Sequence, residues 1–318
     1  MSGQYINPHD KYYLSAPKLY KIAMRYISNH FPAMIILLIS SCTGSKQFAG
    51  QTNMALDAYQ TGDYTKALEY AEEIIIKTGV KGKSAEGQIY DIAGKSSYKL
   101  EAYDKSRDFL IAAREQGYSD EQTMLFQADN YHRIDNLSKE ITLLEEYIQK
   151  YPGGKYINAI RTRLFQTCQE SENTALAQEL WPLLDPQSRA ETGNLEVYLA
   201  INQVLENDQV CDSIANLILD AHPEHESSLN WYAEKYYWKA ENSYQAEMKA
   251  YEENKTRKQY AKLLKAFKIV TIDFKQSLDY YTKLYNLYPK PEYAKYLGNI
   301  YARLSDEKNA KFYHDKAI

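Results

Sequence analysis

The sequence predicts an all-α protein, a solenoid of about seven helix pairs, and three observations lead to this fold class. Residues that break helices are sparse, since the 318-residue chain has 13 Gly and 9 Pro. A pattern of small and aromatic residues recurs along the chain, with Gly94 and Ala128 at equivalent places 34 residues apart. Residues 226–288 lack both Gly and Pro, so helices there are free to be unusually long.

Residues 1–41 are predicted to be a leader that is separate from the solenoid. A basic start is followed by the apolar run 31–39 and by two serines before Cys42, which is the order of an export signal. The run is shorter than the roughly 20 apolar residues that a membrane-spanning helix needs. The start of translation is left open between Met1 and Met24.

The end of this leader resembles a bacterial lipobox. Ile39-Ser40-Ser41-Cys42 has an aliphatic residue and two small ones before the cysteine. The resemblance implies a lipoprotein whose mature N-terminus, Cys42, carries palmitate or a similar lipid. Thr43 follows the cysteine in place of an aspartate. The resemblance therefore implies an anchor in the bacterial outer membrane, facing the periplasm. The alternative is an N-terminal helix that ends in an ordinary cysteine.

After a short tether at residues 42–48, residues 49–184 are predicted to form an N-terminal array of helix pairs. Each pair consists of two short helices that meet at a polar turn, and small residues let the helices approach closely. The first turns are expected at Gly62-Asp63, Glu101-Ala102 and Asp135-Asn136. In the fourth pair Pro182 lacks an amide hydrogen, so it should end the second helix early.

Residues 185–194 are predicted to be a connector, and residues 195–318 to be a C-terminal array. This array includes a long helical hairpin at about residues 226–288. Its equivalent small residues, Ala233 and Gly298, lie 65 residues apart, whereas the regular period is 34. The difference lengthens each hairpin helix by about 15 residues, so the hairpin should project from the array.

The two hairpin helices are expected to run antiparallel and to meet near Asn254. Trp231 and Trp238 lie on one face of the first helix and are expected to pack in the core rather than stack on a ligand. On the second helix, spacings of four and three predict one apolar seam. Its expected members are Tyr260, Leu264, Phe267, Thr271, Phe274, Leu278, Tyr281 and Tyr285.

The repeats resemble the tetratricopeptide repeat (TPR). The shared features are a small residue in each helix, a turn between the helices and a closing proline, as at Pro152, Pro223 and Pro289. The match extends from about Ala49 to the C-terminus. The resemblance implies a right-handed α-solenoid of TPR-like helix pairs, in which the first helix of each pair lines a concave ligand-binding face.

Carried over position by position, the resemblance places a set of side chains on this concave face. Amides and isolated charges can pair with the main chain of an extended peptide or with sugar hydroxyls. The expected binding residues are Gln88, Asp91, Lys95, Tyr98, Gln122, Asp129, His132, Gln166, Gln169, Asn230, Glu234 and Tyr237. The alternative is a polar face that is only solvated.

A basic segment marks the tip of the predicted hairpin, where no acid follows Glu253 until Asp273. A basic amphipathic helix can meet anionic lipid or an acidic partner. The residues expected to do so are Lys255, Arg257, Lys258, Lys262 and Lys265. The alternative is a solvated helix face that nearby glutamates, among them Glu247, neutralise.

Charge and the absence of motifs limit the possible functions. Beyond residue 41 the chain has 34 basic and 41 acidic residues, and a net charge of about −7 argues against nucleic acid as a partner. The sequence has no phosphate-binding glycine loop, nucleophile elbow or zinc-protease helix. No catalytic residue, cofactor or metal site is therefore predicted. Cys168 and Cys211 are expected to be buried thiols.

Two functions remain open from the sequence. The first is a membrane-anchored, non-enzymatic scaffold that binds other envelope proteins or peptides. The second is the capture of a glycan or small ligand on the polar and aromatic concave face. No polar capping helix follows the last repeat in the sequence, so a homo-oligomer through that repeat is a further expectation.

Overall fold

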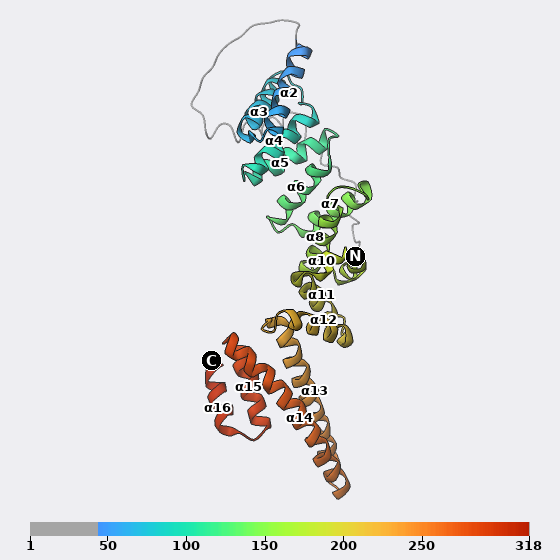
Figure 1. The fold of residues 1–318 in the computed structure, drawn as a ribbon, viewed down its shortest axis with the longest axis vertical. Coiled ribbons are helices and arrows are strands. Elements are labelled where there is room, and N and C mark those ends of the chain that lie inside the picture. The colour runs from blue at the N-terminus through green and yellow to red at the C-terminus, as the bar shows by residue number, and fades with distance from the viewer. Residues whose placement is uncertain (1–43, 318) are drawn as a thin grey trace, which may run out of the picture. The chain divides into compact units, whose positions relative to one another are not determined.

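The computed structural model describes residues 44–317, with side chains from Gly50 onward, and this part of the chain contains helices and turns but no strand (Figure 1). The predicted leader and the lipid site at Cys42 lie outside the described residues. The chain divides into two compact units, unit 1 up to Asn173 and unit 2 from Thr174. This division falls before the predicted connector at 185–194.

Unit 1 is a series of antiparallel helices in which each helix packs on the next along the chain. Its helices are α2 (Gly44–Gln60), α3 (Tyr64–Val80), α4 (Gly87–Lys99), α5 (Tyr103–Glu115), α6 (Glu121–His132), α7 (Leu137–Lys150) and α8 (Ile157–Glu170). The core runs between successive pairs, and its fully buried members include Phe109, Leu144 and Phe165.

Unit 2 begins with short segments and continues with longer helices. Its elements are α9 (Thr174–Leu180), the 3-10 helix η1 (Trp181–Leu183), α10 (Pro186–Ala190), α11 (Thr192–Val204), α12 (Asp208–Ala221), α13 (Glu226–Glu253), α14 (Arg257–Leu287), α15 (Pro291–Arg303) and α16 (Glu307–Lys316). The α-helix α9 ends at Leu180, two residues before Pro182. This agrees with the early stop that the missing proline amide predicts.

One turn geometry recurs between the two helices of the regular pairs. In each of these turns, one residue has φ in the left-handed region, as Asp135 does. The next residue comes directly before the second helix, and its N–H donates to the carbonyl five residues earlier, as from Asn136 to Tyr131 (2.9 Å). The left-handed residues are Gly62, Glu101, Asp135, Glu172, Glu206 and Ser305. The repeat that the sequence predicts is thus also present in the backbone.

Close approach of the two helices within a pair depends on small residues. A Cβ added to Gly94 in α4 would lie 2.5 Å from Leu110 Cδ2 and 3.1 Å from the Leu110 amide nitrogen in α5. Leu110 is itself fully buried. Only a residue without a Cβ therefore lets α4 and α5 approach this closely.

The predicted long hairpin is formed by α13, of 28 residues, and α14, of 31 residues. The two helices run antiparallel, and their tip extends beyond the segment of α14 on which α15 packs (Figure 1). The turn at residues 254–256 lacks the left-handed residue of the other turns. Thr256 caps α14 instead, because its hydroxyl accepts a hydrogen bond from the Gln259 amide (3.2 Å).

The predicted seam of α14 is only partly correct in its distal half, where Phe267 stacks on Tyr244 of α13. Tyr260 and Leu264 are 49% and 47% exposed, and the residues buried there are Leu263 and Val270. At about 100° per residue, Leu263 lies roughly 100° around the helix from Leu264. The sequence contains both apolar stripes, and packing on α13 buries the one that is continuous with Phe274.

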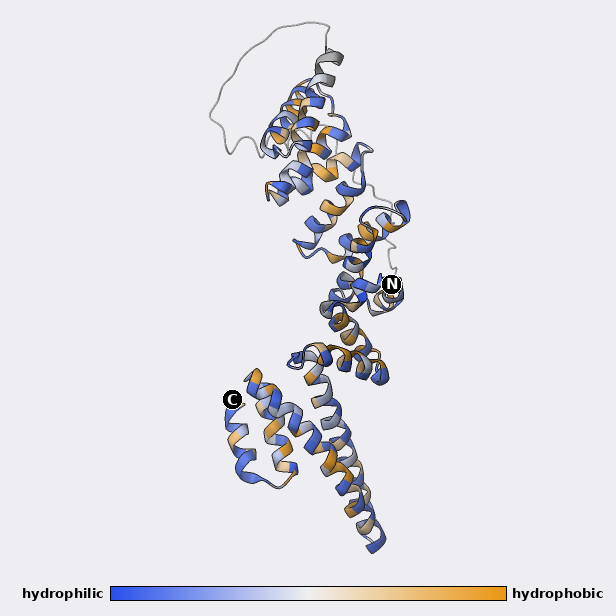
Figure 2. Ribbon diagram, viewed as in Figure 1, coloured by the Kyte–Doolittle hydropathy of each residue, from blue (hydrophilic) through white to orange (hydrophobic). Residues whose placement is uncertain are grey.

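Figure 2 shows hydrophilic residues along every described helix. Within residues 44–317, none of the helices combines the length and the apolar character that crossing a membrane requires. The buried apolar residues of α13 and α14, among them Leu229, Val270 and Phe274, pack within unit 2.

Candidate functional site

The first helices of unit 1 carry most of the predicted concave-face residues, and the structure separates these into two groups. Asp91 and Lys95 of α4 are only 2% and 5% exposed. The others are half-buried and reach solvent: Gln88, Tyr98, Gln122, Asp129, His132, Gln166 and Gln169. Whether any of these residues binds a ligand stays a prediction. A ligand can reach the half-buried side chains but not those of Asp91 and Lys95.

Asp91 and Lys95 belong to a network between α4 and the start of α6. Lys95 Nζ lies 2.7 Å from Asp91 Oδ2 and 2.6 Å from Asp120 Oδ2. Thr123 Oγ1 donates to Asp91 Oδ1 (2.5 Å), and Asp120 caps α6 by accepting from the Thr123 amide. Burial favours a neutral amine, but the two carboxylates outweigh it and hold the pKa of Lys95 above its ordinary value. These groups fix the contact between two repeats.

Tyr98 and Asp129 are joined in a second cluster. The Tyr98 hydroxyl donates to Asp129 Oδ2 (2.9 Å), which also accepts from Arg133 Nε (2.6 Å). The Tyr98 ring stacks on Phe126 with the centroids 3.9 Å apart. Burial, with the hydrogen bond to Asp129, raises the pKa of Tyr98 to about 12. The phenol is thus neutral at physiological pH and acts as a hydrogen-bond donor.

His132 lies at the end of α6, beside two acids. Its Nδ1 is 3.0 Å from Glu140 Oε2 and 3.7 Å from Glu170 Oε2. Glu140 is fully buried and also accepts from Arg163 Nε (2.7 Å). The cluster therefore connects three helices, α6, α7 and α8, and leaves the imidazole 32% exposed.

Among the predicted binding residues of unit 1, Gln88 and Gln169 have side-chain amides that are free for a ligand. The amide of Gln122 is partly engaged, because its Oε1 accepts from the Tyr59 hydroxyl (2.9 Å). Within the described chain, neither a hydrogen bond nor an ion pair engages the side chains of Gln88 and Gln169. A side-chain amide offers both a donor and an acceptor, so each of these two can pair with a peptide group.

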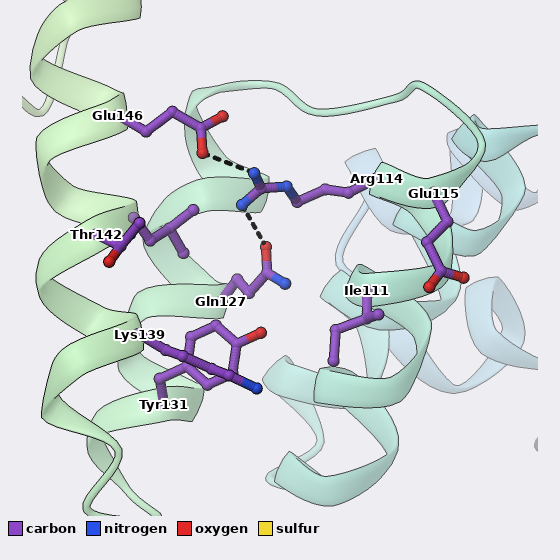
Figure 3. A pocket seen from close by; sticks show the side chains of 9 residues that line it. Ile111, Arg114, Glu115, Gln127, Tyr131, Lys139, Thr142 and Glu146 are labelled. Carbon is purple, nitrogen blue, oxygen red and sulfur yellow. Dashed lines mark hydrogen bonds and ion pairs between the residues drawn. The ribbon is translucent and has the colours of Figure 1, made fainter. Parts of the chain in front are cut away.

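A pocket of about 300 Å³ lies between α5 and α7, over α6 (Figure 3). Arg114 reaches from the end of α5 across the opening, where its guanidinium donates to Glu146 Oε2 (2.6 Å) and Gln127 Oε1 (3.3 Å). Lys139 Nζ lies 5.4 Å from the centre of the Tyr131 ring. Arg114 of α5 is already paired with Glu146 of α7, so its charge joins two repeats and is not free for a ligand in the pocket.

In unit 2, the predicted residues Asn230, Glu234 and Tyr237 lie along α13. Asn230 Nδ2 donates to Glu234 Oε1 (3.0 Å), and both side chains are half-buried. Tyr237 is only 6% exposed and meets Tyr296 of α15 edge to face at 4.9 Å. Its hydroxyl accepts a weak hydrogen bond from Asn299 Nδ2 (3.4 Å). Tyr237 therefore contributes to packing more than to an open surface.

Trp238 is the exposed aromatic residue of this face, and the expectation that it packs in the core is wrong. It is 49% exposed, whereas Trp231 is half-buried and donates from Nε1 to Asp212 Oδ1 (3.0 Å). The period of the helix could have predicted this exposure from the sequence. At about 100° per residue, Trp238 lies half a turn around α13 from the buried Leu229. It follows Glu234 by one turn of α13.

The basic residues predicted at the hairpin tip are all exposed: Lys255, Arg257, Lys258, Lys262 and Lys265. Of these, Lys262 makes an ion pair, with Glu247 at 3.5 Å. In the described chain the other cations have no acidic partner. Local neutralisation of the tip is therefore limited to one long pair.

The two cysteines of the described chain are buried and free. Burial raises the pKa of Cys168 to about 12 and that of Cys211 to about 11. Both therefore remain thiols, which are poor nucleophiles. Residues 44–317 contain no cluster of His, Cys, Asp and Glu that is arranged to hold a metal ion.

Comparison by sequence finds no relative: no protein-family model matches the chain, and no curated protein matches it. Comparison by structure does find similar folds. The C-terminal part of a TPR repeat-containing protein from Cytophaga hutchinsonii has a TM-score of 0.51 and 12% identity, covering 84% of this chain and 93% of that one. This similarity shows that the chain has the solenoid fold of TPR proteins.

Two further structures are more distant. YrrB, described as a TPR protein with an unusual peptide-binding site, has a TM-score of 0.47 and 13% identity, covering 57% of this chain and 89% of that one. A tetratricopeptide repeat protein from Parabacteroides merdae has a TM-score of 0.43 and 10% identity, covering 86% of this chain and 93% of that one.

Proposed function

We propose that this chain is a non-catalytic TPR scaffold that binds extended peptide segments of partner proteins along its first helices. We further propose that a lipid on Cys42 anchors it to the bacterial outer membrane on the periplasmic side. The first proposal rests on the exposed Trp238 in the TPR-type fold. The second rests on the lipobox-like order of residues 39–42.

The exposure of Trp238 is the observation that carries the binding function. Tryptophan is enriched among the residues that dominate protein interfaces, so a half-exposed indole is a candidate anchor for a ligand. Tyr237 packs at its edge, with the ring centroids 5.1 Å apart, so the indole has a fixed support on one side. Its other surface is available to a ligand.

The polar groups around Trp238 favour a peptide as the ligand. Glu234 lies one turn before it on α13, and Asn299 of α15 donates to the hydroxyl of the neighbouring Tyr237 (3.4 Å). An apolar anchor flanked by separated donors and acceptors suits an extended chain with alternating side chains and peptide groups.

The states of the polar groups support a binding role over a catalytic one. The two buried thiols are protonated. Lys95 is engaged with two carboxylates, which hold it between repeats. A lysine held in this way is not free to exchange protons with a substrate.

The second candidate function is capture of a glycan. The same observation favours it, since an exposed indole can also stack on the apolar face of a sugar ring while Asn and Glu bind hydroxyls. The two functions differ in the number of anchors that they need. A peptide uses side chains along several repeats, whereas a short glycan uses the surroundings of Trp238 alone.

Photo-crosslinking in cells tests the binding function. A photoreactive amino acid in place of Trp238 should give discrete protein adducts that mass spectrometry identifies. The matched control is the same residue in place of Phe312, which is 52% exposed on α16. Equal adducts from both positions, or none from position 238, would contradict the scaffold. Glycan-array binding that Trp238→Ala removes would then favour glycan capture.

The anchor has its own test. Cells that express the chain should incorporate labelled palmitate into it, and the Cys42→Ala variant should not. Label that persists in this variant would rule out the lipid attachment at Cys42. The result is independent of the crosslinking experiment.

A further inference from the structure

The outer face of the distal half of α14 exposes apolar side chains. Ile269 and Ile272 are each 58% exposed, and no larger exposed fraction occurs among the isoleucines and leucines of the described chain. In this half, α14 packs on α13 through Leu263, Val270 and Phe274, which lie on the opposite side of the helix. The two isoleucines thus contribute nothing to the core of the hairpin.

Lysines surround these isoleucines. Lys265 lies one turn before Ile269, Lys268 lies one turn before Ile272, and Lys275 lies about one turn after it. Spacings of three and four residues place them on one helical face. Lys258 and Lys262 continue the row toward the tip. All of these lysines are exposed.

Within the described residues, most of the positive charge on this face is not neutralised. The acid that interrupts the row, Asp273, is 5% exposed and accepts a hydrogen bond from Lys239 Nζ of α13 (2.8 Å). Lys262 is 3.5 Å from Glu247. Within the described residues, no acid pairs with Lys258, Lys265, Lys268 or Lys275.

We propose that this face of α14 binds the surface of an anionic lipid bilayer. The lysine ammonium groups would pair with phosphate groups of the lipid, and Ile269 and Ile272 would insert between the headgroups. This inference concerns a surface that the proposed peptide site does not use. It also does not require lipid on Cys42.

The shape of the surface fits a bilayer. The row from Lys258 to Lys275 extends over about 26 Å of a straight helix at 1.5 Å per residue, which is long enough to lie along a plane. Long lysine stems can run beside the isoleucines while the charges reach the phosphates. Each basic residue near an anionic bilayer contributes about 1 kcal/mol, so several together give measurable binding.

Vesicle sedimentation tests the proposal with the full chain carrying Cys42→Ala, which removes any acyl anchor. Neutral vesicles contain phosphatidylcholine alone, and anionic vesicles contain phosphatidylcholine with phosphatidylglycerol. Binding to the neutral vesicles measures the contribution of segments that do not depend on lipid charge. The test variant is Lys265→Gln, Lys268→Gln and Lys275→Gln combined. The matched control changes three other exposed lysines without acidic partners, Lys83, Lys308 and Lys311, to Gln.

The test variant should bind anionic vesicles about 100-fold more weakly than the parent, while the control changes binding by less than about threefold. Binding by the parent should weaken steeply as salt is added. Equal binding to neutral and anionic vesicles, or equal loss in the test and control variants, would overturn the proposal. Since the replaced side chains are exposed, helicity by circular dichroism should not change.

A second variant separates a bilayer from an acidic protein. Ile269→Gln with Ile272→Gln keeps every charge and should weaken vesicle binding at least about tenfold. The same variant should bind a soluble polyglutamate peptide as the parent does. Polyglutamate binding without vesicle binding by the parent would overturn the lipid proposal and indicate an acidic protein partner. Neither result depends on crosslinking from position 238.

Discussion

At the scale of single residues, the difference between held and free polar groups explains how the surface is divided. Lys95 is fixed by Asp91 and Asp120, whereas the amides of Gln88 and Gln169 have no partner in the described chain. Removing one member of a buried charged pair leaves the other unpaired at a cost of several kcal/mol. Held groups therefore maintain the solenoid, and free ones are available for recognition.

Gly94 provides a test of how closely the helices of a pair approach. Gly94→Ala should lower the free energy of unfolding by about 1–2 kcal/mol, because a clash with the buried Leu110 outweighs the better helix propensity of alanine. Gly193→Ala in α11 is the matched control, since its new Cβ would meet nothing within 4 Å. Urea unfolding measures both. Equal losses would contradict the account.

The pair of Glu241 and Arg303 should make stability depend on pH. Arg303 donates from Nε (2.8 Å) and Nη2 (2.5 Å) to the two carboxylate oxygens. These hydrogen bonds lower the pKa of Glu241 below its ordinary value of 4.5. A depressed carboxyl pKa stabilises the fold above the unfolded pKa, and this contribution disappears as pH falls through the folded pKa.

Glu241→Gln should therefore cost about 1 kcal/mol at about pH 7 and less at about pH 3, on the acid side of the ordinary carboxyl pKa. The estimate is modest because Arg303 is partly exposed to solvent, which screens the pair. Urea unfolding of parent and variant at both pH values measures the difference. A gap between them that does not change with pH would exclude the ion pair as its cause.

Single residues also show where prediction from the sequence succeeds and fails. The burial of Cys168 and Cys211 follows from their apolar neighbours and is confirmed. Tyr237 and Trp238 are adjacent and both aromatic, so composition does not tell which one faces solvent. The helical period separates them, because Trp238 lies half a turn around α13 from the buried Leu229, whereas Tyr237 lies on the side that α15 covers.

At the scale of secondary-structure elements, the turns of the regular pairs are the most uniform feature. Glu101, Asp135 and Glu206 are exposed and have φ values of 60°, 55° and 55°. A left-handed conformation costs an ordinary residue about 1 kcal/mol or more. The packing of the two helices in each pair must therefore hold these turns in place.

Replacing such a residue by glycine should relieve this cost. Glu206→Gly should raise the free energy of unfolding by about 0.5–1 kcal/mol, because glycine adopts a φ of this sign readily. Gly62→Ala, at the equivalent place with a φ of 83°, should lower it by about 1 kcal/mol. Thermal unfolding compares the two. Destabilisation by Glu206→Gly would show that its side chain, and not its backbone, matters.

The elements themselves could largely be predicted from the sequence. The length and the turn of the hairpin follow from the stretch without Gly or Pro and from the polar run before Arg257. The buried stripe of distal α14 could not be predicted, because Leu263 and Val270 compete with Tyr260 and Leu264. Both stripes are apolar, and only the position of α13 selects one.

At the scale of the whole molecule, each of the two units is an array in which neighbouring helices contact one another. The period of about 34 residues is enough to predict this class, and the similarity to the TPR structure from Cytophaga hutchinsonii confirms the fold. The same period leaves the ligand open. Stacking fixes the small and buried positions, whereas the exposed face varies without affecting the fold.

We propose that the face around Trp238 binds protein segments, and an affinity measurement tests this binding most directly. The segment that crosslinks to position 238 would be made as a synthetic peptide and titrated by calorimetry against the parent chain, Trp238→Ala and Phe312→Ala. A central aromatic anchor contributes about 2 kcal/mol or more. We therefore expect binding to weaken about 30-fold or more in Trp238→Ala and less than twofold in Phe312→Ala. Equal affinity of all three proteins would contradict the account.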